Sequence, residues 1–278
     1  MSFHINHKIK SANPSVISSR YGSDVPNTLK LLSYNIQAGI GTSNYYHYLT
    51  RSWRHILPDW RGVQRLDRIA KVVAEYDLVA LQEVDGGSLR SSFVNQVAYI
   101  ADLGGFDYWY QQLNRDLGRL GQFSNGVLSR FVPFEIEDHK LPGLKGRGAI
   151  VAKYGNPKSP IVLVGVHLAL SEKARYRQLD YLRDLIQHHE HVVVMGDMNC
   201  RGDQLIDTPL RDTHLIQVNG NHHTFPSWKP DRNIDHIMVS PSLKIRKVEV
   251  LDYTYSDHCP IAMEIEVPKD VKEGFLEL

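Results

Sequence analysis

The sequence has little of what marks secreted, membrane-spanning or strongly charged proteins. Its 278 residues include 2 cysteines, too few for a disulfide framework, which indicates a reducing compartment. No apolar run reaches the length of a membrane span, and the stretch MSFHINHKIK contains no apolar signal core. The formal net charge is +1, so no strong global field attracts nucleic acid or anionic membranes. We therefore expect a cytoplasmic protein without a transmembrane segment, for which peripheral membrane contact stays open.

What is present is the composition of a folded domain. Apolar residues make up 42% and charged residues 23% of the chain, which is ordinary for a protein with a large core. Residues 1–28 are polar and show no periodicity, so we expect an N-terminal tail there. One domain would span residues 29–267, and residues 268–278 would form a C-terminal tail. We expect this protein to be a monomer.

Apolar runs that end abruptly in polar residues recur along the chain, and each predicts a buried strand. The clearest is HVVVMGDMNC at 191–200, where a run of valines leads to Gly196, Asp197 and Asn199. A glycine at the mouth of a buried strand lets the backbone turn, or lets another group come close. Because Asp197 and Asn199 are two residues apart, they point the same way on extended backbone. A polar turn that caps the next segment is the alternative.

Other predicted strands end in the same manner. One ends at Asn35, whose carbonyl oxygen suits a hard cation, and another delivers Glu83, a carboxylate of the kind that commonly binds magnesium. A third ends at His167, which could donate to a phosphate oxygen or protonate a leaving group. Taken singly, a turn former, a surface carboxylate and a histidine bonded to backbone explain these residues at least as well.

The last polar strand end lies near the C-terminus. Asp257 and His258 stand together before a strand predicted at 261–267. Asp235 lies near the start of another predicted strand, 233–239, and could orient the imidazole of His258. Asp257 could contact a metal ion or a water molecule.

Helical periodicity is found in three segments. Apolar spacing predicts helices over 63–76 and 171–189, and a further one that begins near Phe93 and stops at Gly104-Gly105. Further strands are predicted at 106–112, 124–130, 149–153, 161–166 and 244–252, of which 149–153 and 161–166 form a hairpin.

An aromatic and arginine-rich segment separates the first predicted strand from the first helix. Residues 42–62 could be a substrate-recognition loop, whose rings stack and whose guanidinium groups hold phosphate. A packed surface loop that covers the edge of the core is an equal alternative. The basic residues of this region could hold a nucleic acid backbone: Arg51, Arg54, Arg61, Arg65 and Arg68.

These polar strand ends, in their order along the chain, resemble the endonuclease/exonuclease/phosphatase superfamily. The matching motifs are LSYNI, LQEV, GVHL, GDMN, IDHI and SDHCP, which lie within residues 29–267. The resemblance implies an α/β fold, a four-layer sandwich of two mostly antiparallel β-sheets packed face to face and flanked by helices. It also implies a metal-dependent phosphoric ester hydrolase in which Mg²⁺ or Mn²⁺ assists the attack of water on phosphate.

The resemblance assigns metal binding and water activation to particular residues. Asn35, Glu83 and Asp257 would bind the metal, and Asp197 would deprotonate or orient the attacking water. Whether Asp197 or His258 is the base stays open, and so does the choice between one metal ion and two.

The remaining motif residues would act on the phosphate. Asn199 and His167 would contact the scissile phosphate and its developing charge, and Asp235 would pair with His258, which binds phosphate or transfers a proton. Four residues outside these roles are expected to contact the substrate: Asn125, Arg147, Arg54 and Trp228.

The substrate class is the part that the motifs constrain least, because nucleases, lipid phosphodiesterases and phosphatases share them and differ in their loops. The near-zero net charge favours a lipid or small organic phosphodiester over duplex DNA. AP endonucleases resemble each other in having a tyrosine where this chain has His167, although deoxyribonuclease-like members have histidine. A DNA or RNA nuclease is the alternative. A small-molecule phosphomonoesterase and a non-catalytic binding module with the same fold are further ones.

Overall fold

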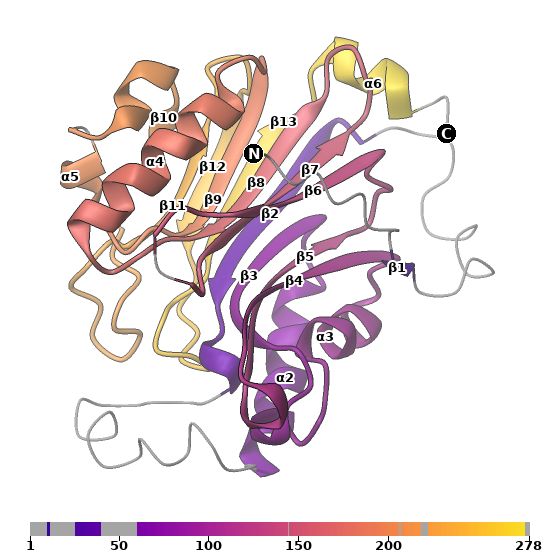
Figure 1. Ribbon diagram of the computed structural model, residues 1–278. Helices are drawn as coiled ribbons and strands as arrows, with labels where there is room; N and C mark the ends of the chain where they lie inside the picture. Colours follow the sequence, from indigo (N-terminus) through magenta and orange to yellow (C-terminus); the bar gives the residue numbers. More distant parts are fainter. Residues whose placement is uncertain are drawn as a thin grey trace.

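Two β-sheets pack face to face, and helices cover both outer faces (Figure 1). The four-layer α/β sandwich expected from the sequence is confirmed. The aromatic segment 42–59, with Arg54, lies outside the described residues. The structure is a computed structural model and describes residues 10–11, 26–39, 60–143, 145–205, 207–217 and 222–275.

One sheet has seven strands and the other has six, and in the described residues each sheet contains a single parallel pair. The seven-stranded sheet has the order β1 (Lys10–Ser11), β4 (Tyr108–Asp116), β5 (Gln122–Ser129), β3 (Leu78–Asp85), β2 (Thr28–Asn35), β13 (Ile261–Glu266) and β12 (Ile245–Val250). The six-stranded sheet has the order β10 (Ile216–Gln217), β11 (Asp235–Val239), β9 (His191–Asp197), β8 (Ile161–His167), β7 (Gly148–Tyr154) and β6 (Glu135–Lys140).

The helices divide between the two outer faces. Helices α2 (Trp60–Val73) and α3 (Gln96–Gly104) pack on the seven-stranded sheet, and α4 (Glu172–Ile186) packs on the six-stranded one. Among the described helices, none is both long and apolar enough to cross a membrane. The shorter helical elements are α5 (Gly202–Leu205), α6 (Lys269–Phe275), and the 3-10 turns η2 (Gln37–Gly39), η4 (Leu89–Ser91), η5 (Gly118–Leu120) and η6 (Pro209–Thr213).

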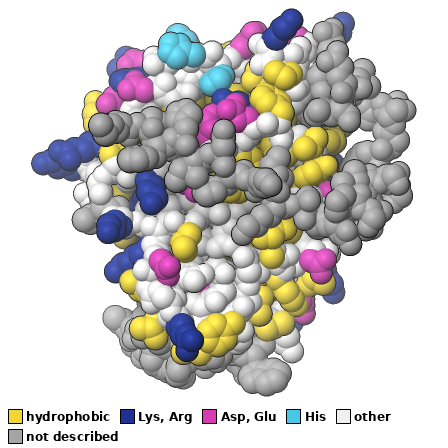
Figure 2. Space-filling view, turned by 45° about the vertical axis from the view of Figure 1, so that its right-hand side comes forward, with side chains coloured by type: hydrophobic (Ala, Val, Ile, Leu, Met, Phe, Trp, Pro, Cys, Tyr) yellow, Lys and Arg dark blue, Asp and Glu magenta, His cyan; other side chains and the backbone are white. Residues whose placement is uncertain are grey.

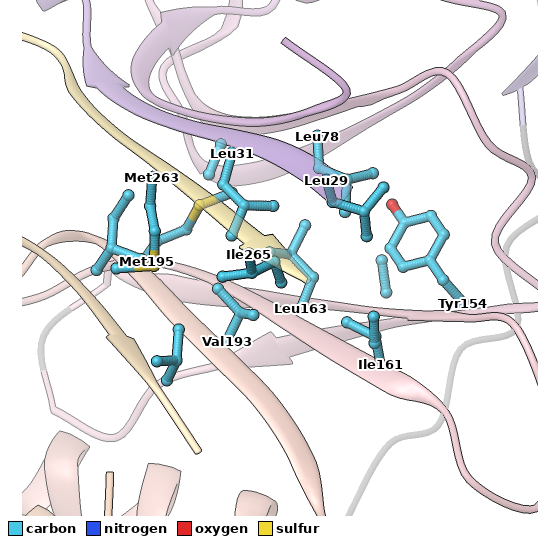
Figure 3. Packing of buried hydrophobic residues seen from close by; sticks show 14 of the residues in the cluster. Leu29, Leu31, Leu78, Tyr154, Ile161, Leu163, Val193, Met195, Met263 and Ile265 are labelled. Carbon is cyan, nitrogen blue, oxygen red and sulfur yellow. The ribbon is translucent and has the colours of Figure 1, made fainter. Parts of the chain in front are cut away.

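The central core lies between the two sheets. Its side chains come from the apolar strands that the sequence marks as buried, and they interdigitate in the middle layer (Figure 3). Leu31 and Met263 meet Leu163, Val193 and Met195 from the opposite sheet. Burial on this scale is the main favourable term in folding, and it fixes how the strand ends of the two sheets lie against each other.

Most of the predicted elements are present with shifted ends. Gly105 ends α3 at φ 67 and donates its N–H to Ala101 O, as a left-handed C-cap does. Ser171 is the N-cap of α4, although its side chain makes no capping hydrogen bond. In the segment 268–278, expected as a tail, helix α6 buries Val271 in the central core.

Gly196 adopts a backbone conformation that other residues rarely adopt. Its φ is +152, and a Cβ atom there would overlap the carbonyl oxygen of Val166 on the neighbouring strand β8. Of the two reasons that the sequence gives for a glycine here, close approach of another group is the one observed.

Replacing Gly196 by alanine should therefore destabilise the fold. We expect a loss of about 2 kcal/mol beyond that of the control Gly118→Ala, because the clash adds to the cost of the left-handed conformation. Gly118 also has a positive φ, of +63, but a Cβ atom added there would have no other atom within 4 Å. Urea unfolding measures both variants, and equal losses would contradict this account.

Candidate active site

Two parallel strand pairs, one in each sheet, contact one another across the core. Strands β2 and β3 are parallel in the first sheet, β8 and β9 are parallel in the second, and β2 and β3 lie against β9 and β8. Parallel strands present their carboxyl ends at one edge of a sheet. Four predicted polar strand ends therefore converge at one edge of the sandwich, which we call the site edge: Asn35, Glu83, His167 and Asp197.

Two antiparallel strands bring the remaining predicted residues to the same edge. β11 runs antiparallel to β9, so its first residue, Asp235, pairs with Asp197. β13 runs antiparallel to β2, and Asp257 and His258 precede its first residue. These residues are far apart in the sequence, and only the sheet topology brings them together.

Asp197 lies at the centre of the site. Its Oδ2 accepts a hydrogen bond from Asn35 Nδ2 at 3.0 Å, and this bond joins the two sheets. The same oxygen is 3.5 Å from His167 Nε2 and 3.9 Å from His258 Nε2, while Oδ1 accepts the Asn199 N–H at 2.9 Å. Burial and then the charge of Asp235 raise the pKa of Asp197 to about 7, against the opposing effect of His258. This carboxylate can take up a proton near neutral pH.

The imidazole of His258 is hydrogen-bonded to the buried carboxylate of Asp235, which Thr224 holds in turn. Its Nδ1 lies 2.8 Å from Asp235 Oδ2, which also accepts the Thr224 hydroxyl at 2.5 Å. Burial alone would lower the pKa of His258, but Asp235, and after it Asp197 and Asp257, raise that pKa to about 10. His258 is therefore an imidazolium at neutral pH, and its Nε2 lies 3.9 Å from Asp197 Oδ2.

His167 has the opposite charge state. Burial, together with the positive charges of Arg147 and His258, holds the pKa of His167 well below its usual range. A neutral imidazole and an imidazolium therefore flank the same carboxylate, Asp197. The neutral ring can donate one hydrogen bond without adding charge to the site.

A hard divalent cation fits the oxygen donors at the mouth of the site. Glu83 has a φ of 55 and lies in an irregularity of β3; its side chain is 41% exposed, and its Oε1 lies 3.8 Å from His167 Nε2. Asn35 Oδ1 accepts the Gln37 N–H at 3.1 Å and keeps a second lone pair. Carboxylate and amide oxygens are ligands that Mg²⁺ and Mn²⁺ prefer.

A second set of candidate ligand atoms is already paired within the protein. One ligand atom each of Asp197, Asp235 and His258 lie within 4.8 Å of one another. His258 Nδ1 is bonded to Asp235, however, and Asp197 Oδ2 accepts from Asn35. This cluster is better described as a hydrogen-bonded charge network than as a cation cage.

The other predicted site residues lie in different surroundings. Asn199 adopts φ 49, and its Nδ2 donates to Leu168 O at 2.9 Å, which fixes it beside Asp197. Asp257 is buried and accepts the Ser256 hydroxyl at 3.1 Å, so metal binding by this residue stays a prediction.

The residues that are predicted to contact the substrate differ in burial and in their hydrogen bonds. Arg147 is half-buried and its charge acts on His167. Asn125 is buried and donates to Gln112 Oε1 and Gly148 O, so it ties β5 to β7 beside the site. Trp228 is half-buried in the loop after the cis peptide Phe225–Pro226. Substrate contact by these three residues stays a prediction.

Two positioning residues are absent from the prediction. Thr224 donates its hydroxyl hydrogen to Asp235 Oδ2, and no pattern in the sequence marks it. Gln96 accepts the Asp85 N–H at 2.8 Å and donates to Ala38 O at 2.8 Å, so it ties the segment after Glu83 to the segment after Asn35. No sequence pattern marks Gln96.

Phe225 forms an aromatic wall beside His258. The two ring centroids are 4.8 Å apart, and the guanidinium of Arg232 lies 4.5 Å from the Phe225 centroid on that ring. The Ser227 N–H donates to Asp257 O at 2.7 Å, which holds this loop against the loop that contains His258. The wall limits solvent access to the imidazole.

Replacing Asp235 by asparagine should release the proton of His258 at lower pH. We expect the pKa of His258 to fall from about 10 by about two units, since the largest favourable charge is removed. NMR titration of the imidazole in EDTA measures the change. The control Asp257→Asn removes a weaker contribution, so an equal shift in both variants would contradict this assignment.

Comparison with known proteins places the chain in a family. No curated protein matches it. Among solved structures, an endonuclease/exonuclease/phosphatase from Beutenbergia cavernae DSM 12333 is 20% identical with a TM-score of 0.68, covering 87% of this chain and 72% of that one. Bacteroides thetaiotaomicron VPI-5482 mannosyl-6-phosphatase Bt3783 is 19% identical with a TM-score of 0.63, covering 86% and 100%.

D. rerio TDP2, complexed with single strand DNA product, is 16% identical with a TM-score of 0.62, covering 87% of this chain and 100% of that one. Identities this low show a common fold only. The family model described as Endonuclease/Exonuclease/phosphatase family, however, matches residues 32–258, most of the chain. The chain therefore belongs to the endonuclease/exonuclease/phosphatase family, as its motifs predict.

Proposed function

We propose that this protein is a Mg²⁺- or Mn²⁺-dependent phosphodiester hydrolase whose substrate is a lipid or a small organic phosphodiester. Family membership makes the chain a hydrolase of phosphoester bonds. The identity of the ion, the diester and the substrate class are the proposed parts. One observation carries the proposal: the buried carboxylate of Asp197 is held by Asn35 between a neutral and a charged imidazole.

The charge states favour Asp197 as the base. An imidazolium cannot accept a proton, and His258 is protonated up to a pH of about 10. The pKa of Asp197, about 7, suits a group that removes a proton from water near neutral pH. Asn35 and the Asn199 N–H fix the orientation of this carboxylate.

The other side chains serve the phosphate. A divalent cation held by Glu83 and Asn35, with Asp257, would neutralise phosphate charge and stabilise the leaving oxygen. The imidazoles of His167 and His258, whose Nε2 atoms lie 3.5 Å and 3.9 Å from Asp197 Oδ2, would supply two further donors to phosphate oxygens. Because His258 is cationic, it also balances the charge that develops on the phosphate.

The low net charge favours a substrate other than duplex DNA. The face in Figure 2 mixes apolar, basic and acidic side chains, without a large area of one charge sign among the described residues. A duplex binder gains from many cationic phosphate contacts, whereas this chain has a net charge of +1. The fold does not choose a substrate, since its neighbours include a mannosyl-6-phosphatase and a TDP2 bound to DNA.

Hydrolysis by the purified protein tests this function. The panel comprises a small synthetic phosphodiester, phospholipid and sphingomyelin vesicles, and abasic, duplex and single-stranded oligonucleotides, each with Mg²⁺ and with EDTA. We expect Asp197→Asn to lower kcat/KM about 10²–10⁴-fold, because the base is lost. The control Asp184→Asn alters an aspartate that is exposed on α4 and should retain activity.

Two results would overturn parts of the proposal. Cleavage of oligonucleotides with lipids and the small diester untouched would make the protein a nuclease. If nothing is hydrolysed and Mg²⁺ leaves the melting temperature unchanged, the non-catalytic binding module becomes the better interpretation.

Gln96 should control metal affinity without touching the metal. Since it ties the segments that follow Asn35 and Glu83, Gln96→Ala should raise the Mg²⁺ concentration at half-maximal activity about tenfold. The control Gln187→Ala removes an exposed glutamine at the end of α4 and should leave the Mg²⁺ dependence unchanged. A loss of stability in Gln96→Ala with unchanged Mg²⁺ dependence would contradict this positioning role.

A further inference from the structure

The β4–β5 hairpin extends past the site edge. β5 runs antiparallel to β3, with Phe123 paired to Asp85, and the Gly86 N–H donates to Gln122 O at 3.0 Å. Residues 117–121, which join β4 to β5, therefore lie beyond the end of β3 that presents Glu83. The hairpin tip stands at the rim of the active site.

Exposed apolar side chains gather on this tip and on the loop beside it. Leu113, Leu117 and Leu120 are 39%, 45% and 59% exposed, and Phe93 is 61% exposed. We call these four residues the tip patch. They are four of the nine large apolar side chains that are exposed among the described residues, and the turns η4 and η5 next to them lie against each other. Apolar groups concentrated at one rim mark an interaction surface.

Hydrogen bonds around the buried carboxylate of Asp85 fix the loop that carries Phe93. Phe93 has a φ of 63, unusual for a bulky residue, and its N–H donates to Ser88 O at 2.7 Å. Asp85 accepts from the hydroxyl and N–H of Ser88 and from Arg90, whose guanidinium lies 4.3 Å from the Phe123 centroid. An exposed phenyl ring is thus presented on a rigid base, at little further entropy cost for binding.

Basic side chains connect the tip to the active site. Arg115 and Arg119 are exposed between the leucines of the hairpin. Arg115 packs by Gly146, since a Cβ atom on that glycine would be 3.7 Å from Arg115 Cβ. The next residue, Arg147, acts electrostatically on His167. Arg119, Arg115 and Arg147 therefore form a basic series from the apolar tip to His167, interrupted by one carboxylate, Asp116, which accepts the Gly118 N–H at 2.8 Å.

We propose that the tip patch docks this protein on an anionic phospholipid surface, with Arg115 and Arg119 at the level of the head groups. The proposal rests on the proposed function and names the surface on which that site would meet its lipid substrate. Leucine and phenylalanine beside arginine is the composition of an interfacial anchor. Three of the four residues of the tip patch are leucines, which provide no donors for nucleic acid and no planar face for its bases, so a lipid is favoured as the partner over a strand stacked on Phe93 alone.

Vesicle co-sedimentation in EDTA tests the surface without turnover. We expect the protein to sediment with phosphatidylcholine vesicles that contain about 30% phosphatidylglycerol, and far less with phosphatidylcholine alone. Leu117→Ser/Leu120→Ser should lower the partition coefficient at least about tenfold. The matched control Leu103→Ser alters a leucine that is 52% exposed on α3 and should bind as the unaltered protein does.

A variant that binds more tightly complements the serine variants, because misfolding can explain a loss of vesicle binding but not a gain. Leu120→Trp should raise the partition coefficient, and its fluorescence emission should shift to shorter wavelength on vesicles as the indole enters the interface. Equal binding by Leu117→Ser/Leu120→Ser and Leu103→Ser, or no binding of the unaltered protein to anionic vesicles, would overturn the proposal. So would binding to a single-stranded oligonucleotide that exceeds vesicle binding and that Arg115→Ala abolishes.

The outcomes separate this surface from the proposed function. Vesicle binding through the tip patch without hydrolysis of any phosphodiester would support the surface and contradict the enzymatic assignment. Hydrolysis of the small synthetic diester without vesicle binding would do the reverse.

Discussion

The hydrogen bond between Asn35 and Asp197 is the contact on which the site depends. It spans the two sheets at 3.0 Å, and it places an amide donor from one sheet against the carboxylate that both imidazoles approach. The bond requires that the parallel pair of each sheet lie opposite the other, which the central apolar core enforces. Gly196, which pairs with Val166 on β8, leaves room for the close approach of the two strands next to Asp197. Packing and chemistry are therefore set by the same few strands.

Burying this network has consequences for stability. The folded-state pKa of Asp197 lies above its unfolded value, so the protonated form is favoured by folding, and that contribution is lost as the pH rises towards about 7. The folded-state pKa of His258 is also raised, so its contribution is present below its unfolded pKa and is lost as the pH rises towards about 10. Asp235 and Thr224 offset part of the cost of the buried charge. Shifted pKa values of this kind are characteristic of sites that hold groups ready to react.

The sequence predicts the strand ends well, because an apolar run that stops at Asn35, Glu83 or His167 is visible without any structure. Strand β6 escapes prediction, since EIEDHK has one apolar residue and little alternation. Thr224 and Gln96 escape for a different reason: their partners, Asp235 in one case and Asp85 with Ala38 in the other, come within reach only through the topology. Periodicity reports which residues are buried, but it does not report which hydrogen bonds join distant segments.

The pH at which the Asp197 carboxyl group loses its proton tests the assignment of this residue as the base most directly. Carbon-13 NMR of the side-chain carboxyl, followed against pH in metal-free protein, measures it. Burial and the charge of Asp235, against the opposing effect of His258, predict a pKa of about 7 for Asp197. A value near 4, which is ordinary for a solvated aspartate, would mean that burial and the Asp235 charge do not act on this group. Asp197 would then lack the raised pKa that makes it suitable as the general base.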